Sequence, residues 1–139
     1  MDYRVFKDKI IVRIDRGEEI LSKIKEVAEK EKVTLAEINA LGAVDDFTVG
    51  CYKADEKKYY PNEFKGCYEI VSLTGTISTM NGEYYSHIHM SAADINGNVV
   101  GGHLNKAIVS VTCEAVITVI DGVVDRKYDE NIGINLFKF

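Results

Sequence analysis

The three histidines of this 139-residue chain all lie in one short stretch, SHIHMSAADINGNVVGGHL, which runs from Ser86 to Leu104. His87 and His89 are two residues apart, and His103 follows a pair of glycines. On a strand, residues two apart point to the same face, so both imidazoles of the pair would face the same way. Neutral imidazole nitrogens are ligands for zinc and related divalent ions. The stretch therefore offers two ligands of a candidate metal site, and a third if His103 folds back onto them.

The position of His103 depends on how its strand pairs with the strand of the other two histidines. We expect a three-residue loop, Asn96–Asn98, which sets His103 opposite Ser91 on the histidine face and Met90 opposite Leu104 on the other. A two-residue turn would send His103 to the wrong face, unless a bulge at the two glycines restored it. The first register is favoured because it groups apolar side chains on one face.

We therefore predict that His87, His89 and His103 bind one divalent transition metal, with zinc the first candidate. Three protein ligands leave a coordination position open for water, a small anion or a substrate. The alternative is three partly exposed histidines hydrogen-bonded within a sheet. No nucleophile constellation accompanies them, so the sequence assigns no catalytic residue and does not decide whether the protein is an enzyme.

Four further residues are candidates for a pocket beside the histidines. Ser91 shares the face of His89 and can hydrogen-bond a ligand, while Gly102 permits close approach of a backbone or ligand. Glu69 and Glu114 interrupt apolar strands, where an unpaired carboxylate is costly. The alternative for the two glutamates is an exposed face or a cationic partner.

Composition limits the partners. The formal charge is −5 and no run of four Lys or Arg occurs, which disfavours DNA because nucleic-acid binding draws on cations that neutralise phosphates. No stretch approaches the roughly 20 apolar residues of a membrane helix, and no signal peptide is recognisable, so we expect a cytoplasmic protein without membrane contact.

Cys51, Cys67 and Cys113 are widely spaced without a C-x-x-C pair, and we expect them to be buried apolar side chains.

The pattern of the whole chain predicts one α+β domain over residues 1–139, a curled, mostly antiparallel sheet of about eight strands with one main amphipathic helix. The helix is expected over Gly17–Lys32, capped by Asp15 with Glu18. Strands are expected at 5–14, 38–44, 47–52, 67–80, 83–95, 107–120, 123–129 and 134–139. Turns are expected at residues 45–46, 81–82 and 121–122. The turn at 121–122 would place Glu114 opposite Asp129. Residues 54–66 are expected to form a surface loop.

One predicted strand, residues 107–120, is apolar on both sides. Its one face would hold Val109, Val111, Cys113, Ala115 and Ile117. A single helix cannot cover both faces of such a sheet, so either the sheet curls on itself or another subunit covers one face, and we favour a homo-oligomer.

Several motifs together resemble the Plants and Prokaryotes Conserved (PPC) domain family, over nearly the whole chain. They are Gly17-Glu18-Glu19-Ile20, Ala40-Leu41-Gly42-Ala43, Gly66-Cys67-Tyr68-Glu69-Ile70-Val71-Ser72-Leu73-Thr74-Gly75, His87-Ile88-His89, Gly101-Gly102-His103-Leu104 and Glu114. The resemblance implies a compact α+β domain that assembles as a homotrimer. It also implies that the three histidines match those that single-domain prokaryotic members keep at a metal site.

The same family includes nuclear DNA-binding proteins of plants, so the resemblance makes DNA binding or transcription regulation the alternative function. This chain lacks the AT-hook, and Cys67 stands where the plant pattern has arginine. A trimer would triple the charge of −5, which further disfavours DNA. A third reading is a cupin-like metalloenzyme acting on a small molecule, although Asp94 stands where the cupin pattern has glutamate.

Overall fold

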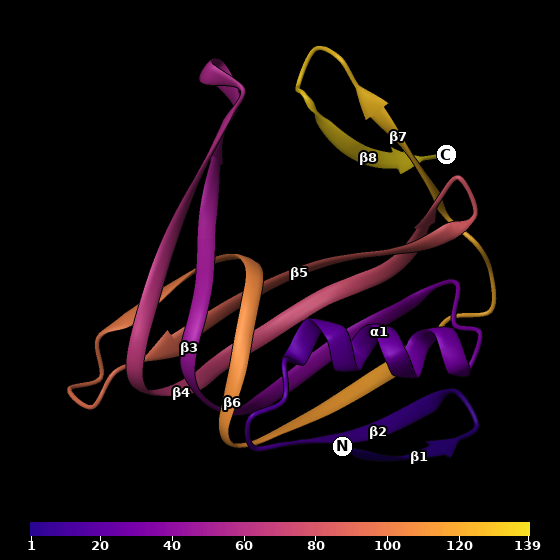
Figure 1. Cartoon of the computed structure of the whole chain (residues 1–139). Coiled ribbons are helices and arrows are strands. Elements are labelled where there is room, and N and C mark those ends of the chain that lie inside the picture. Colours follow the sequence, from indigo (N-terminus) through magenta and orange to yellow (C-terminus); the bar gives the residue numbers. More distant parts are fainter.

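The computed structural model describes residues 1–139 as eight strands, one α-helix and one short 3-10 helix (Figure 1). In chain order the elements are β1 (Asp2–Phe6), β2 (Lys9–Asp15), α1 (Ile20–Lys30), β3 (Ala36–Lys53), η1 (Ala54–Glu56), β4 (Lys58–Met80), β5 (Glu83–Ala93), β6 (Val99–Val119), β7 (Asp125–Asp129) and β8 (Ile134–Lys138). The predicted α+β class, with about eight mostly antiparallel strands and one helix, is confirmed.

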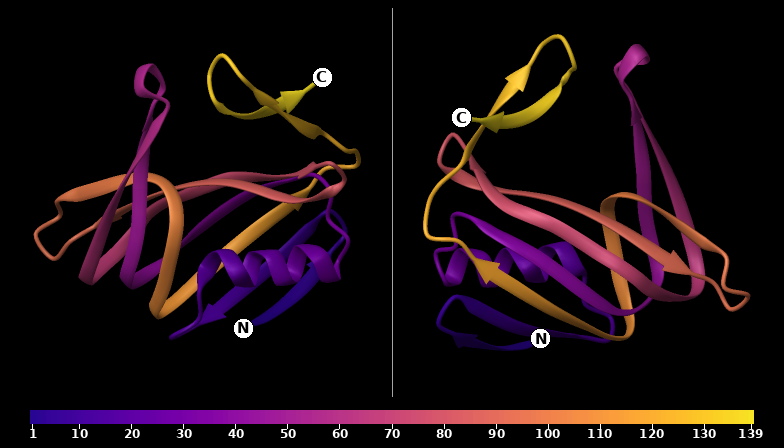
Figure 2. Two further views of the ribbon diagram at one scale, coloured as in Figure 1. Left: turned by 45° about the horizontal axis from the view of Figure 1, so that its top comes forward. Right: turned by 180° about the vertical axis from the view of Figure 1, so that it is seen from behind.

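Six strands form one antiparallel sheet in the order β1-β2-β6-β3-β4-β5. The sheet curls until β5 also pairs with the first part of β6, through residues 89–93 and 99–103. The second part of β6 lies between β2 and β3. Figures 1 and 2 show the resulting arrangement, in which α1 covers one face of the curled sheet and the opposite face stays free of helix.

The helix begins at Ile20, three residues later than predicted, because Glu19 rather than Asp15 is its N-terminal cap. The Glu19 carboxylate accepts hydrogen bonds from the backbone N–H of Leu21 at 3.1 Å and of Ser22 at 2.7 Å. The Asp15 carboxylate instead binds Nε of Arg13 at 2.8 Å.

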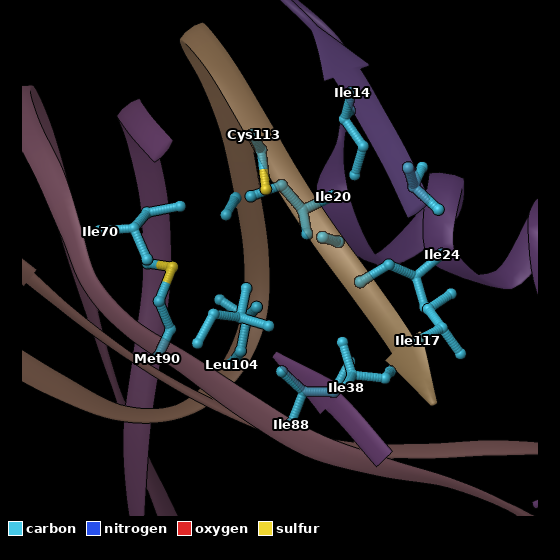
Figure 3. Packing of buried hydrophobic residues seen from close by; sticks show 14 of the residues in the cluster. Ile14, Ile20, Ile24, Ile38, Ile70, Ile88, Met90, Leu104, Cys113 and Ile117 are labelled. Carbon is cyan, nitrogen blue, oxygen red and sulfur yellow. The ribbon is translucent and has the colours of Figure 1, made fainter. Parts of the chain in front are cut away.

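The core lies between α1 and the inner face of the sheet (Figure 3). Ile20 and Ile24 of the helix are fully buried against strand residues such as Ile38, Ile88 and Ile117. Helical spacing on α1 and alternation on the strands place these side chains on facing surfaces, which is the pattern that the sequence predicted. Every second residue of each strand is therefore left for the opposite, outer face.

Two predicted connections are wrong because the chain pairs more extensively. Asp45-Asp46 is not a turn but an irregularity inside β3, which continues as one strand to Lys53. Residues 54–66 are not a surface loop, since β4 begins at Lys58 and Pro61 pairs with Gly50. The ends of β3 and β4 form a long two-stranded arm that projects from the sheet, capped by η1 (Figure 1). The predicted strand at 5–14 is likewise a hairpin of β1 and β2, with Lys7 at a positive φ of 51°.

The C-terminal strands form a separate hairpin. The predicted pairing of residues 123–129 with β6 is wrong, because β2 and β3 already occupy both edges of β6 there. β7 pairs with β8 instead. Glu114 therefore lies opposite Arg13 and Leu41 rather than opposite Asp129.

Bulges change which side chains of the long strands face outward. β6 contains a register shift between Val109 and Cys113. Val111, which lies within the shift, is 67% exposed, although the sequence predicts it on the same face as the buried Val109 and Cys113. β4 has a similar shift at Val71, which is also exposed. The single helix is neither long nor apolar enough to cross a membrane.

Candidate metal centre

His87, His89 and His103 come together on the outer face of the sheet. β5 carries the first two at alternate positions, and the register sets His103 of β6 directly opposite His89. The predicted convergence is observed, but the predicted register is wrong, since Ser91 lies opposite Gly101 and Met90 opposite Gly102.

The register differs because the connecting loop has five residues, Asp94 to Asn98. The Asp94 carboxylate accepts hydrogen bonds from the backbone N–H of Asn96 at 2.8 Å and of Asn98 at 2.9 Å, and from Nδ2 of Asn98 at 3.0 Å. Gly97 takes the positive φ of 81° that closes the loop. Asp94, the residue in the position of the cupin glutamate, is thus engaged in the loop.

The imidazoles are close enough to share one ion. One nitrogen from each of the three rings lies within 4.8 Å of the other two, and Nε2 of His87 is 3.2 Å from Nε2 of His89. Two nitrogens that bind one tetrahedral zinc at about 2.0–2.1 Å stand about 3.3 Å apart. The donor set and its spacing therefore fit a divalent transition metal, and the exposure of His87 and His89 leaves room for a further ligand.

The environment favours neutral imidazoles. Loss of hydration around the ring lowers the pKa of His87, and the nearby His103, His89 and Arg126 lower it further. Loss of hydration, followed by the charge of His89, lowers the pKa of His103. Neutral rings are the form that binds a metal, so no proton has to be displaced from these two at neutral pH.

Hydroxyl groups line the strand next to the histidines. Thr74 of β4 lies opposite His89 and Thr76 opposite His87. Beside His89 is a shallow pocket of about 250 Å³. Its lining residues are Ser72, Thr74, His89, Met90, Ser91, Gly101 and Gly102.

Of the four predicted pocket residues, Ser91 and Gly102 line this pocket, and Glu69 and Glu114 do not. Both glutamates are exposed. The sequence reasoning missed Ser72 and Thr74, although their alternation with apolar residues in SLTGT was a usable signal for one polar face.

The two glycines before His103 serve backbone packing. A Cβ on Gly102 would lie 2.4 Å from the carbonyl oxygen of Gly50 on β3, and one on Gly101 would lie 2.8 Å from that of Met90 on β5. Only glycine lets β6 approach both neighbours at this point. The close approach therefore fixes where His103 stands.

Tyr59 supports His103 from the arm, which the sequence analysis did not foresee. Its hydroxyl donates to the carbonyl oxygen of His103 at 3.1 Å and also contacts Oδ1 of Asn105, and its ring lies edge-on to the imidazole of His103. No sequence signal reveals this contact, because the sequence predicts a surface loop for the segment that contains Tyr59.

The cysteines are not part of the site. Cys113 is buried, as expected, but Cys51 and Cys67 are exposed because they lie on the arm and at its base, outside the core.

Comparisons with known proteins agree with this architecture. The sequence model of the Plants and Prokaryotes Conserved (PCC) domain matches residues 1–121. The search of curated proteins gives no match.

Three solved structures are similar over almost the full length of both chains. A protein from Bacteroides thetaiotaomicron, named as a candidate DNA-binding protein, has 28% identity and a TM-score of 0.96, covering 99% of this chain and 96% of its own. A metal-containing protein from Archaeoglobus fulgidus has 32% identity and a TM-score of 0.89, covering 99% and 97%. A plant- and prokaryote-conserved protein from Pyrococcus horikoshii has 29% identity and a TM-score of 0.83, covering 96% and 93%.

Proposed function

Since this chain belongs to the Plants and Prokaryotes Conserved domain family, we propose that it is a metal-binding member whose three histidines hold one divalent transition metal, zinc in the first instance. The observation that carries the proposal is the 3.2 Å separation of two imidazole nitrogens, with the third imidazole within 4.8 Å. The metal-containing relative from Archaeoglobus fulgidus supports it.

A small molecule or anion is the proposed occupant of the open coordination position. A bound divalent ion with three protein ligands supplies a Lewis-acidic centre at that position. The chain contributes the hydroxyls of Ser72, Thr74 and Ser91 on the His89 side, which can hydrogen-bond a ligand. No residue near the imidazoles forms a base–nucleophile pair, so the proposal is binding and not a particular reaction.

Titration of metal-free protein with Co²⁺ tests the site, because the visible spectrum of Co²⁺ reports its ligands. We expect one equivalent to bind with the spectrum of a four- or five-coordinate nitrogen-rich site, and zinc to displace it. A His103→Asn variant should bind far more weakly, since two histidines alone make a poor site. Thr118→Ala, at the other end of β6, is the matched control and should bind normally. Equal Co²⁺ binding by wild type and His103→Asn would contradict the proposal.

DNA binding is the second candidate, and its support is the name of the relative from Bacteroides thetaiotaomicron. The charge of −5 counts against it. Titration of a fluorescent DNA duplex at low salt would decide, and we expect no saturable binding below micromolar protein.

We further propose that the chain forms a homotrimer. The outer face, opposite α1, exposes Leu41, Val71 and Val111 where β3, β4 and β6 bend, together with Ile11 and Val116, which pair across β2 and β6. A set of five exposed aliphatic side chains on adjoining strands is typical of a surface that another subunit covers. The family resemblance makes further copies of this chain the proposed cover.

A further inference from the structure

Arg126, on the C-terminal hairpin, is a buried cation without an anionic partner. Only 5% of the residue is exposed. Its guanidinium is stacked between the rings of Tyr85, at 4.7 Å, and Phe137, at 4.2 Å. No carboxylate lies within 4.0 Å of it, and the neighbouring Asp125 accepts a hydrogen bond from the hydroxyl of Thr79 instead. Burying a guanidinium without a counter-ion is costly, so its retention calls for an explanation.

The guanidinium is held in place but is not saturated with hydrogen bonds. Nε donates to the hydroxyl of Ser78 at 2.9 Å, and Nη1 donates to the carbonyl oxygen of Asn135 at 3.1 Å. Nη2 has no partner in the chain. Only the hydroxyl oxygens of Tyr84 and Thr112 are both fully buried and without a hydrogen-bond partner, so Nη2 is not fully buried. Nη2 therefore keeps contact with solvent and can donate to a ligand.

The register places this cation beside the candidate metal centre. Ser78 of β4 pairs with Tyr85 of β5. Two residues further along the same pair of strands, Thr76 pairs with His87. Residues two apart share a face and stand about 7 Å apart, so Arg126, packed on Ser78 and Tyr85, is on the histidine face, next to His87. Figures 1 and 2 show β7–β8 standing over this end of β4 and β5.

We propose that Arg126 binds an oxyanion group of a small organic acid whose other oxygen group binds the metal held by the three histidines. The inference rests on the proposed metal site and specifies its ligand class. A positive, rigidly stacked guanidinium with a free N–H, next to a divalent ion, recognises two negatively charged groups at a fixed separation. The hairpin that supplies Arg126 lies beyond residues 1–121, the part matched by the family model.

Malonate, with two carboxylates, and acetate, with one, are the probes for Co²⁺-loaded protein. Perturbation of the Co²⁺ spectrum gives the affinity of each. We expect malonate to bind the wild type more tightly than acetate does. Arg126→Met, which keeps a long side chain between the two rings, should weaken malonate binding by about tenfold to a hundredfold, the effect of one charged hydrogen bond, and leave acetate unchanged. Lys127→Met removes an equal charge from an exposed neighbour on the same strand and should change neither affinity.

Metal content and the thermal midpoint of each variant separate the outcomes. If Arg126→Met does not fold, Arg126→Lys decides, because it keeps the charge but not the planar fork and should still weaken malonate binding. Malonate affinity within twofold of wild type in a folded, fully loaded variant would overturn the role of Arg126 and leave the metal site intact. Failure of the wild type to bind Co²⁺ would overturn the metal site and this inference with it.

Discussion

The chemistry of single residues here is decided by which face of the sheet each one reaches. His87 and His89 face outward because they alternate with the buried Ile88 and Met90 on β5. This much follows from the sequence, since period-two alternation is readable from residue types alone. The exact partner of His103 was not readable, because the register depends on the side-chain hydrogen bonds of Asp94.

Position relative to the core separates the three cysteines in the same way. Burial raises the pKa of the Cys113 thiol to about 12, whereas Cys51 and Cys67 are exposed. We expect a thiol reagent at pH 8 to modify Cys113 only on unfolding, because the reactive form is the thiolate. In a Cys113→Ala variant, only the slow thiol modification that requires unfolding should disappear. Rapid modification of all three thiols in the native protein would contradict the burial of Cys113.

At the level of elements, the site depends on a close crossing of strands. We expect Gly102→Ala to destabilise the protein by about 1–3 kcal/mol, because its Cβ would press on the backbone of Gly50. Metal affinity should fall as well, since His103 is the next residue on β6. Urea unfolding and Co²⁺ titration measure the two effects. Gly97→Ala is the control: nothing lies within 4 Å of its Cβ, so only its positive φ costs stability, and Co²⁺ affinity should not change. Unchanged Co²⁺ affinity in Gly102→Ala would show that the crossing does not position His103.

The elements themselves were predictable where periodicity is strong. The helix, the strands of the histidine hairpin and the turn at Asn81-Gly82 all follow from local patterns, and both turn residues have the positive φ that such a turn requires. The β4 side of the arm was not predictable, because residues 54–66 are rich in charged side chains and contain Pro61, and only long-range pairing with β3 makes most of this segment a strand. The C-terminal hairpin was misassigned for a related reason: local patterns do not reveal that both edges of β6 are occupied.

For the whole molecule, the exposed aliphatic side chains of the outer face predict assembly. We expect light scattering to give three times the chain mass of 15.5 kDa. Val111→Lys should reduce this mass towards that of one chain, because a charge would be buried at the proposed contact. Ile95→Lys is the matched control, since Ile95 is 83% exposed in the loop after β5, and it should leave the assembly unchanged. A wild-type mass of 15.5 kDa at micromolar concentration would contradict the trimer.

The most direct test of the metal centre is the metal content of the untagged protein, measured by inductively coupled plasma mass spectrometry. A His87→Ala/His89→Ala variant, purified in parallel, provides the comparison. We predict close to one equivalent of zinc or another divalent transition metal per chain in the wild type, and its loss in the variant. Absence of metal from the wild type, even after incubation with zinc, would contradict the account, and so would equal metal content in both proteins.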